Sequence, residues 1–327
     1  MVLSRKRKAK LFKLLGIVEL PVLPYILNIE PGNICNLHCP LCPTGSGDKS
    51  LSKGLMNLGV FKVIFDQLFY SIESMNIYSW GEPFLNKELV DIIRYAKKKS
   101  SKVRIATSTN LNVRNNELLA DFIGSGIDEV IISCDGIDQS SYARYRRGGD
   151  FGLVIANMKY LADINEKREL QSKLVWNFIV FKHNETMVDQ ARKMAEEIGV
   201  EFRVGLMRTS MKDEILKPHK EAIAKDKEWI PDNPDYSAYD KEGLATKKPI
   251  KTCRKPWQEI SINWDGKVFP CCAVYGDDFN FGDVTKDSIV KIWNNEKYIE
   301  ARKEIINRRR KAATICGICR NNGFMHM

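Results

Sequence analysis

The 327-residue sequence has no apolar run of the roughly 20 residues that a membrane-spanning helix requires. Its first 25 residues are basic and partly apolar, but Lys13 and Glu19 interrupt the apolar stretch and no small-residue cleavage site follows. These absences argue against a transmembrane segment and a secretory signal peptide. We interpret residues 1–25 as a basic N-terminal lead-in and expect the protein to be cytoplasmic.

The chain also lacks an acidic excess, because 51 Lys and Arg outnumber 41 Asp and Glu and leave a net charge of +10. Much of the excess lies in two runs, residues 5–13 and 308–311. A solvated surface is the simpler explanation of these runs, while a dock for an acidic electron carrier, an anionic membrane surface or a phosphorylated substrate are alternatives. Aromatic residues are not interleaved with the basic ones, so nucleic acid is not an expected partner.

A disulfide framework is not expected either, since no export signal accompanies the nine cysteines. Eight of them fall into three groups and one stands alone: Cys35, Cys39 and Cys42; Cys253, Cys271 and Cys272; Cys316 and Cys319; and Cys134. Clustered cysteines in a reducing compartment indicate metal binding.

Short apolar segments alternate with longer segments of helical period between residues 26 and 206. The expected strands are Ile26–Glu30, Asn76–Ser79, Val103–Ser108, Glu129–Cys134, Leu174–Phe181 and Glu201–Leu206. The expected helices are Val60–Ser71, Lys87–Lys99, Asn116–Ile123, Gly152–Asn165 and Thr186–Ile198. This alternation predicts a parallel α/β sheet with right-handed crossovers. Six strands are too few for a closed eight-stranded barrel, so we expect a partial (β/α)6 barrel over residues 26–209, with functional groups at the carboxyl ends of its strands.

The pattern changes after the barrel. Residues 210–252 are rich in Lys, Asp, Pro and Tyr with little periodicity, and we interpret them as a linker or a substrate-facing loop. Residues 253–327 carry the remaining cysteines and form a small C-terminal module. Within it, alternating residues around Asp265-Gly266 predict a hairpin over Ser261–Phe269.

Cys35, Cys39 and Cys42 are spaced C-x3-C-x2-C directly after the first expected strand. Three thiolates can satisfy three irons of a [4Fe–4S] cubane and leave the fourth iron open to a ligand. A structural zinc site would need a fourth ligand, which His38 could supply, so zinc stays an alternative.

This motif at the start of a partial barrel resembles the radical S-adenosylmethionine (SAM) superfamily. The resemblance implies that the open iron binds the amino and carboxylate groups of SAM. It further implies that one electron, from a donor such as flavodoxin or ferredoxin, cleaves SAM to methionine and a 5′-deoxyadenosyl radical that abstracts a substrate hydrogen. Leu41 stands where the family usually has an aromatic residue.

Further segments after successive strands are similar to the SAM-contacting motifs of the same family. Gly81-Glu82-Pro83 resembles its Gly-Gly-Glu-Pro motif, with Trp80 in place of the first glycine. Glu82 or nearby backbone carbonyls would accept hydrogen bonds from the SAM ammonium. The segment that ends in Asn110 resembles its Thr-Asn-Gly motif, with Leu111 replacing the glycine.

Ser133-Cys-Asp-Gly136 resembles the Ser-x-Asp-Gly segment of the family. The resemblance implies that Ser133 and an arginine eleven residues later, Arg144, bind SAM, with Arg146 and Arg147 as alternatives.

The cysteines of the C-terminal module could ligate tetrahedral zinc or a fully ligated [4Fe–4S] cluster, and spacing alone does not choose between them. The module resembles the SPASM/twitch extension of radical SAM enzymes, which implies one auxiliary [4Fe–4S] cluster. The implied ligands are Cys253, Cys271, Cys316 and Cys319, with Cys272 as a rival for the second position.

A fully ligated auxiliary cluster is suited to electron transfer, which favours a two-electron oxidation. The cysteine spacing is similar to that of 2-deoxy-scyllo-inosamine dehydrogenases, so dehydrogenation of a sugar, cyclitol or similar alcohol is the leading interpretation. A SPASM-type peptide or protein maturase is the alternative, although the short segment before Cys35 favours a small-molecule substrate. A non-catalytic iron–sulfur or zinc module is a third possibility that predicts no SAM binding. No motif identifies a general base.

Overall fold

The computed structural model describes residues 4–48, 52–209, 215–217, 219–240, 247, 252–274 and 276–322. Its centre is one sheet in the order β6-β5-β4-β3-β2-β1-β7-β8-β9. The strands are β1 Ile26–Ile29, β2 Ser74–Ile77, β3 Arg104–Thr109, β4 Glu129–Ser133, β5 Lys173–Val180, β6 Glu201–Leu206, β7 Glu259–Ile262, β8 Lys267–Phe269 and β9 Gly282–Asp283. Strands β1 to β6 pair in parallel, so the expected six-stranded partial barrel is confirmed.

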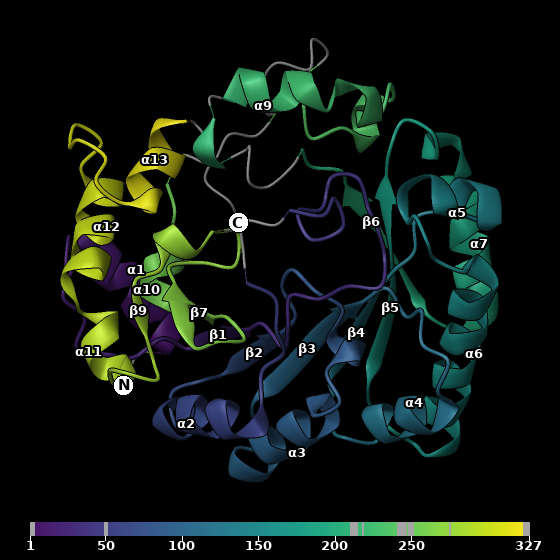
Figure 1. Ribbon diagram of the computed structural model, residues 1–327, viewed down its shortest axis with the longest axis horizontal. Coiled ribbons are helices and arrows are strands. Elements are labelled where there is room, and N and C mark those ends of the chain that lie inside the picture. Colours follow the sequence, from purple (N-terminus) through teal and green to yellow (C-terminus); the bar gives the residue numbers. More distant parts are fainter. Residues whose placement is uncertain are drawn as a thin grey trace.

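Helices on the outer face of the curved sheet connect these strands (Figure 1). They are α2 Leu58–Leu68, α3 Leu89–Lys99, α4 Asn116–Ile123, α5 Gln139–Tyr145, α6 Phe151–Lys167 and α7 Val188–Ile198, with short 3-10 turns η1 Pro83–Leu85 and η2 Glu185–Met187. Each helix turns an apolar stripe toward the sheet. In α2, for instance, Phe61, Ile64, Phe65 and Leu68 are all buried. The carboxyl ends of all six strands are thereby left for functional groups.

The C-terminal module is part of the same sheet. β7 pairs in parallel with β1, with Leu27 opposite Ile260, and β8 pairs antiparallel with β7. The predicted hairpin is therefore confirmed, and Gly266 takes the positive φ of +88° that its turn requires. The pairing with β1 joins segments more than 200 residues apart, which no local sequence pattern specifies.

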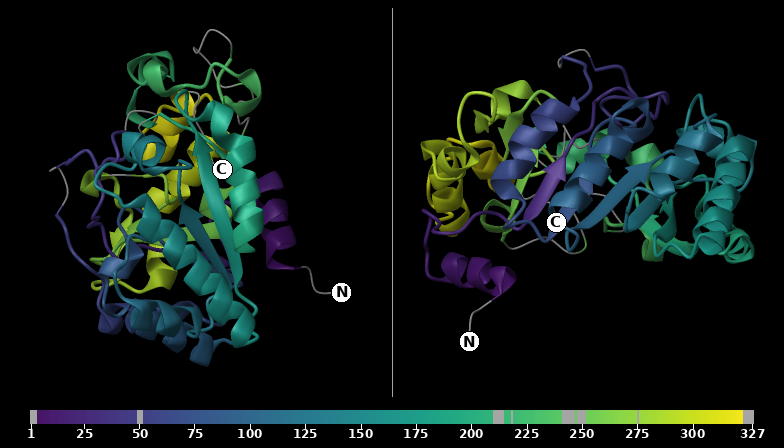
Figure 2. Two further views of the ribbon diagram at one scale, coloured as in Figure 1. Left: turned by 90° about the vertical axis from the view of Figure 1, so that its right-hand side faces the viewer. Right: turned by 90° about the horizontal axis from the view of Figure 1, so that it is seen from below.

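Short helices complete the module and the lead-in: α1 Arg5–Leu14, α10 Lys255–Gln258, η5 Asp277–Phe279, α11 Ile289–Trp293, α12 Glu296–Ile306 and α13 Ile315–Asn321. Buried Arg302 binds these parts together, because its guanidinium donates to the carbonyls of Val18, Pro256 and Trp293 at 2.8–2.9 Å. Figure 2 shows α1 on the periphery of the body. None of the helices in the described part of the chain has the length and apolarity needed to cross a membrane.

The described part of residues 207–240 forms α9 His219–Lys225, η3 Lys227–Trp229 and η4 Pro234–Tyr236. Ile223, Ile230 and Tyr239 from this segment share a second apolar cluster with Leu37 and Leu41. The segment therefore packs on the loop that carries the first three cysteines and buries Leu37 and Leu41 of that loop.

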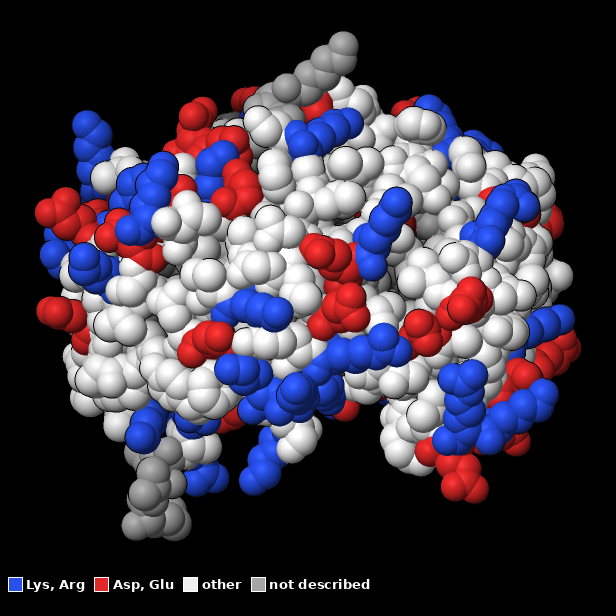
Figure 3. Space-filling model, turned by 60° about the horizontal axis from the view of Figure 1, so that its bottom comes forward, with Lys and Arg blue, Asp and Glu red and all other residues white. Residues whose placement is uncertain are grey.

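Basic and acidic side chains are interspersed on the face shown in Figure 3. Several basic residues are paired on the surface, such as Arg310 with Glu300 at 2.7 Å and Lys99 with Asp66 at 3.0 Å. Part of the basic excess is thus an ordinary solvated, paired surface.

Candidate functional site: two groups of cysteines at the mouth of the barrel

The loop after β1 carries Cys35, Cys39 and Cys42. Cys39 is buried, and the other two are half-buried. Two donors point at the Cys35 sulfur, the Leu37 backbone N–H at 3.4 Å and the Asn110 side-chain amide at 3.7 Å. The pKa of Cys35 is raised to about 11, chiefly by burial and further by nearby Glu82, Cys39 and Cys42. Three thiols thus lie on one loop, as a cubane with three protein ligands requires.

Two glycines let other backbone segments approach this loop. A Cβ added at Gly81 would lie 2.2 Å from the Gly32 carbonyl oxygen, and one at Gly45 would lie 2.6 Å from the Cys39 nitrogen. The N–H of Glu82 also donates to the Ile34 carbonyl at 2.8 Å. The Gly-Glu-Pro turn is therefore fitted directly against the cysteine loop, which only glycine at position 81 permits.

Glu82 is buried and holds the end of β3. Its carboxylate accepts from the Thr109 hydroxyl at 2.6 Å, the Asn110 N–H at 2.8 Å and the Phe84 N–H at 3.1 Å. Burial raises the pKa of Glu82, and these three hydrogen bonds oppose the shift. These three hydrogen bonds use most of the lone pairs of the Glu82 carboxylate. Glu82 therefore positions the turn and Asn110.

Asn110 faces the cysteine loop, where its side-chain amide donates to Asn36 at 2.8 Å as well as to Cys35. The next residue, Leu111, adopts φ = +54°, the left-handed conformation that the expected glycine would take without strain. Leu111 is fully buried, and its carbonyl accepts from Asn157 at 3.0 Å. Packing and this hydrogen bond hold a conformation that Leu normally avoids.

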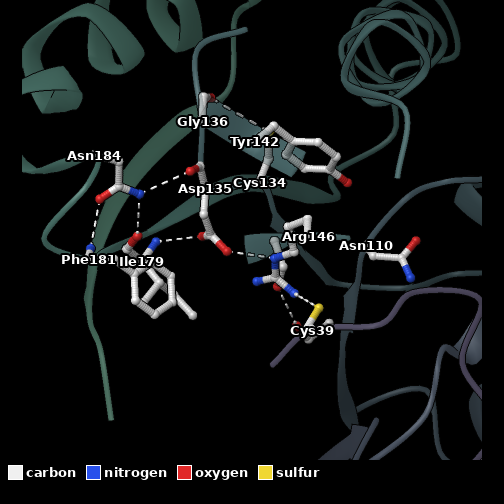
Figure 4. A network of polar contacts seen from close by, with 12 residues as sticks. Cys39, Asn110, Cys134, Asp135, Gly136, Tyr142, Arg146, Ile179, Phe181 and Asn184 are labelled. Carbon is white, nitrogen blue, oxygen red and sulfur yellow. Dashed lines mark hydrogen bonds and ion pairs between the residues drawn. The ribbon is translucent and has the colours of Figure 1, made fainter. Parts of the chain in front are cut away.

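Asp135 and Arg146 connect β4 and α5 to the cysteine loop (Figure 4). Arg146 Nε donates to Asp135 Oδ2 at 2.6 Å, and Arg146 Nη1 lies 4.0 Å from the Cys39 sulfur. The other oxygen of Asp135 accepts from the Ile179 N–H at 2.7 Å. Burial raises the pKa of the Cys39 thiol, and the fixed positive charge of Arg146 opposes that shift.

The remaining SAM-contact predictions lie around this network. Ser133 is half-buried at the end of β4, with its hydroxyl 3.4 Å from that of Ser108. Arg144 is exposed on α5, and only Arg146, which the sequence offered as an alternative, reaches the first group of cysteines. The assignment of Arg144 stays a prediction, and the geometry favours Arg146.

The second group of cysteines surrounds a hollow in the C-terminal module. Cys253, Cys271, Cys316 and Cys319 line one apolar pocket with Ile215 and neighbouring residues of α10 and α12. Burial raises the pKa values of Cys271 and Cys316, and the neighbouring thiols add to the shift. Tertiary structure has therefore brought the four expected ligands together around one space.

Cys272 lies outside the four-thiol hollow. It lines a small polar pocket at the ends of β1 and β7, with its sulfur 3.9 Å from Lys255 Nζ, and it does not line the four-thiol hollow. The geometry thus favours Cys271 over Cys272 as the auxiliary ligand. Among the described residues, no three His, Cys, Asp or Glu side chains are gathered tightly around the position of a single metal ion.

Helix α13, which carries Cys316 and Cys319, is anchored by buried Glu304 of α12. The Glu304 carboxylate accepts from the backbone N–H groups of Ala313 and Thr314 and from the Thr314 hydroxyl. A carboxylate at these orphan N–H groups fixes the start of the helix.

Comparison with known proteins identifies the class of protein that this fold and site define. Residues 29–198 match the model of the radical SAM superfamily, and residues 253–320 match the iron–sulfur cluster-binding SPASM domain. The chain belongs to the radical SAM superfamily and carries a C-terminal SPASM domain.

Individual relatives are distant. The chain is 22% identical over 315 residues to the AdoMet-dependent heme synthase of Methanosarcina barkeri, with 87% of this chain and 85% of that protein covered. It is 26% identical over 296 residues to the PqqA peptide cyclase of Bradyrhizobium diazoefficiens, with 84% and 74% covered. Among solved structures, BtrN in complex with AdoMet and 2-DOIA shares the fold at a TM-score of 0.56 and 17% identity, over 91% of this chain and 93% of that one.

Membership in this family means that the enzyme uses SAM, a SAM-binding [4Fe–4S] cluster and auxiliary iron–sulfur ligation, and that it needs a reductant. The residues present fit these groups, since the loop after β1 supplies three thiols and one pocket in the module supplies four. The expected family and cofactors are thereby confirmed.

Proposed function

We propose that this enzyme dehydrogenates an alcohol, in a sugar, cyclitol or similar small molecule, by a two-electron oxidation. Cys35, Cys39 and Cys42 would hold the SAM-binding cluster, and Cys253, Cys271, Cys316 and Cys319 would hold one auxiliary [4Fe–4S] cluster. When bound, SAM and its cluster supply the radical that removes a hydrogen atom from the substrate. A flavodoxin- or ferredoxin-type donor would deliver the reducing electron.

The single observation that carries this proposal is the four-thiol hollow. Four protein thiolates would satisfy all four irons of an auxiliary cubane and leave none open to substrate. Electron transfer is the chemistry left to such a cluster, and a substrate radical that loses an electron becomes an oxidised product. Cys271 also lines the small polar pocket at the strand ends, so the hollow adjoins the mouth of the barrel.

The chain's own residues would position the groups of the first site. Glu82 holds the end of β3, and Arg146 places a positive charge beside Cys39. The apolar cover formed by Ile223, Ile230 and Tyr239 packs on Leu37 and Leu41 of the loop. We place the functional divisions at 1–25, 26–209, 210–252 and 253–327, with the third division as a linker or substrate-facing loop whose described part supplies this cover.

Isotope transfer tests the proposal directly. The reconstituted enzyme would be supplied with SAM, a reductant and alcohols deuterated at the carbinol carbon. We expect a ketone or aldehyde product together with deuterium in 5′-deoxyadenosine. A product that has the same oxidation level as the substrate would refute the dehydrogenase assignment.

The second candidate is a peptide or protein maturase, which the 26% identity to a PqqA peptide cyclase supports. A gene for a short precursor peptide beside the gene of this protein would favour this candidate, whereas sugar-handling genes would favour the dehydrogenase. Incubation with such a peptide, followed by mass spectrometry, separates the two.

A further inference from the structure

Glu30 is a buried carboxylate that lacks a complete set of partners. It follows β1 directly and is only 2% exposed. Its Oε2 accepts a long hydrogen bond of 3.5 Å from the Trp264 N–H, and the Trp80 backbone also donates to the carboxylate. In the part of the chain that the structure describes, its Oε1 has no hydrogen-bond partner.

Such an oxygen is energetically costly, because an unpaired buried acceptor loses its hydration without compensation. Burial raises the pKa of Glu30 to about 7, and the backbone donors of Trp264 and Trp80 oppose the shift while Asp265 and Asp277 add to it. Lys267 binds both of these aspartates, at 2.8 and 2.7 Å, and so moderates their effect. Glu30 is therefore a group that can gain or lose a proton near neutral pH.

Glu30 also lines the small polar pocket at the carboxyl ends of β1, β2 and β7. The other polar groups there are Asn28, Tyr78, Ser79, Ser261, Asn263 and Cys272. The pocket also reaches Cys271, an expected auxiliary ligand. Its volume of about 10 Å³ is close to what one water molecule needs. The pocket can thus hold one water beside Glu30, at the carboxyl ends of these strands.

We propose that Glu30 is the proton acceptor for the alcohol that this enzyme oxidises, and that the proton reaches it through one water in the polar pocket. This inference rests on the proposed function. It assigns the general base that no sequence motif identified, and it places that base beside the route of the electron toward Cys271.

The proposed step balances. The carbinol C–H bond is broken first, and its hydrogen atom ends in 5′-deoxyadenosine. The O–H proton of the resulting radical would pass through the pocket water to the Glu30 carboxylate, and the auxiliary cluster, when bound, would take up one electron as the C=O bond forms. The alcohol loses two electrons and two hydrogens, one as an atom and one as a proton.

The test compares the wild-type holoenzyme with Glu30→Gln and a matched control, using carbinol-deuterated 2-deoxy-scyllo-inosamine as the probe. Because a proton acceptor acts after hydrogen abstraction, Glu30→Gln should keep deuterium transfer to 5′-deoxyadenosine while ketone formation falls about 100-fold. In the wild type, ketone formed per deuterium transferred should rise with pH through about 7, since the acceptor is the deprotonated carboxylate. In Glu30→Gln this dependence should vanish.

Glu129→Gln is the control, because Glu129 is also largely buried but lies at the amino end of β4, paired with Arg104 and Arg203. It should retain both readouts and the pH profile. Unchanged ketone formation in Glu30→Gln would overturn the proposal. An equal loss of deuterium transfer and ketone formation would also overturn it, because Glu30 would then be needed at or before the hydrogen-abstraction step.

A wild-type enzyme that transfers deuterium without forming ketone would refute the proposed function. The protonation of Glu30 can still be measured in that case, by infrared spectroscopy of the protein without turnover. Infrared difference spectra across pH 6–8 should show a protonated carboxyl band that titrates near pH 7 in the wild type and is missing in Glu30→Gln. A Glu30 carboxyl that is still protonated at pH 8 in the wild type would exclude it as a proton acceptor.

Discussion

Arg146 Nε lies 2.6 Å from Oδ2 of Asp135, and the carboxylate of Asp135 is completely buried. The same guanidinium reaches the Cys39 sulfur at 4.0 Å, so one ion pair ties the end of β4 to the first cysteine loop. An ion pair in this setting is sensitive to the loss of either partner, because the remaining charge stays buried without compensation.

Replacing the cation of this pair should destabilise the protein strongly. We expect Arg146→Leu to lower the free energy of unfolding by about 3–5 kcal/mol, since it leaves the buried Asp135 carboxylate without its ion-pair partner. Anaerobic urea unfolding of the purified protein measures the change. Arg114→Leu is the matched control, because Arg114 pairs with Asp150 on the surface and should cost at most about 1 kcal/mol. Equal effects of both substitutions would contradict the structural role of Arg146.

A methyl group at Gly81 should displace the cysteine loop. In Gly81→Ala the new Cβ would lie 2.2 Å from the Gly32 carbonyl oxygen and 2.8 Å from that of Ile34. We expect anaerobic reconstitution to yield about four irons per chain instead of about eight, since only the auxiliary cluster would assemble. Gly152→Ala, whose Cβ would meet its nearest neighbour at 3.5 Å, should retain the full iron content.

Iron and sulfide counts should separate the two clusters. The triple variant Cys35/Cys39/Cys42→Ala should hold about four irons, where the wild type holds about eight. About four irons in both proteins would mean that the first loop binds no cluster, and the proposed SAM site would be wrong.

The same count decides between adjacent cysteines in the module. Cys271→Ala should lose or destabilise the auxiliary cluster, because Cys271 lines the four-thiol hollow. Cys272→Ala should keep about eight irons, because Cys272 lines the polar pocket instead. The reverse result would reassign the ligand.

Glu304 should be required for the auxiliary cluster although it is no ligand. Glu304→Ala removes the acceptor that fixes the N-terminus of α13, and this helix carries Cys316 and Cys319. We expect loss of about four irons with the SAM-binding cluster retained. The control is Glu300→Ala, because Glu300 lies on α12 like Glu304 but pairs with Arg310 on the surface. This variant should leave the iron content unchanged.

The barrel was largely predictable, because its signals are local. Strand β6 and helix α4 coincide with their expected bounds, and the hairpin after β7 follows from the Asp265-Gly266 turn. Apolar periodicity and turn chemistry act within a few residues, so they can be recognised without knowing the fold.

Other features depend on contacts between distant segments. The resemblance to a Thr-Asn-Gly motif hints at a left-handed φ at position 111, but only packing and the hydrogen bond from Asn157 explain how Leu111 holds it. The anchoring of α13 by Glu304 and the parallel pairing of β7 with β1 have no sequence signature.

The sequence by itself determined the family, the cofactors and the first group of cysteines, because those depend on residue types at fixed short spacings. Only the tertiary structure decided which cysteine joins the four-thiol hollow, that Arg146 and not Arg144 reaches Cys39, and that Glu30 keeps an unpaired oxygen at the strand ends. Each of these depends on the direction in which a side chain points and on what a distant segment places beside it, and a linear pattern encodes neither.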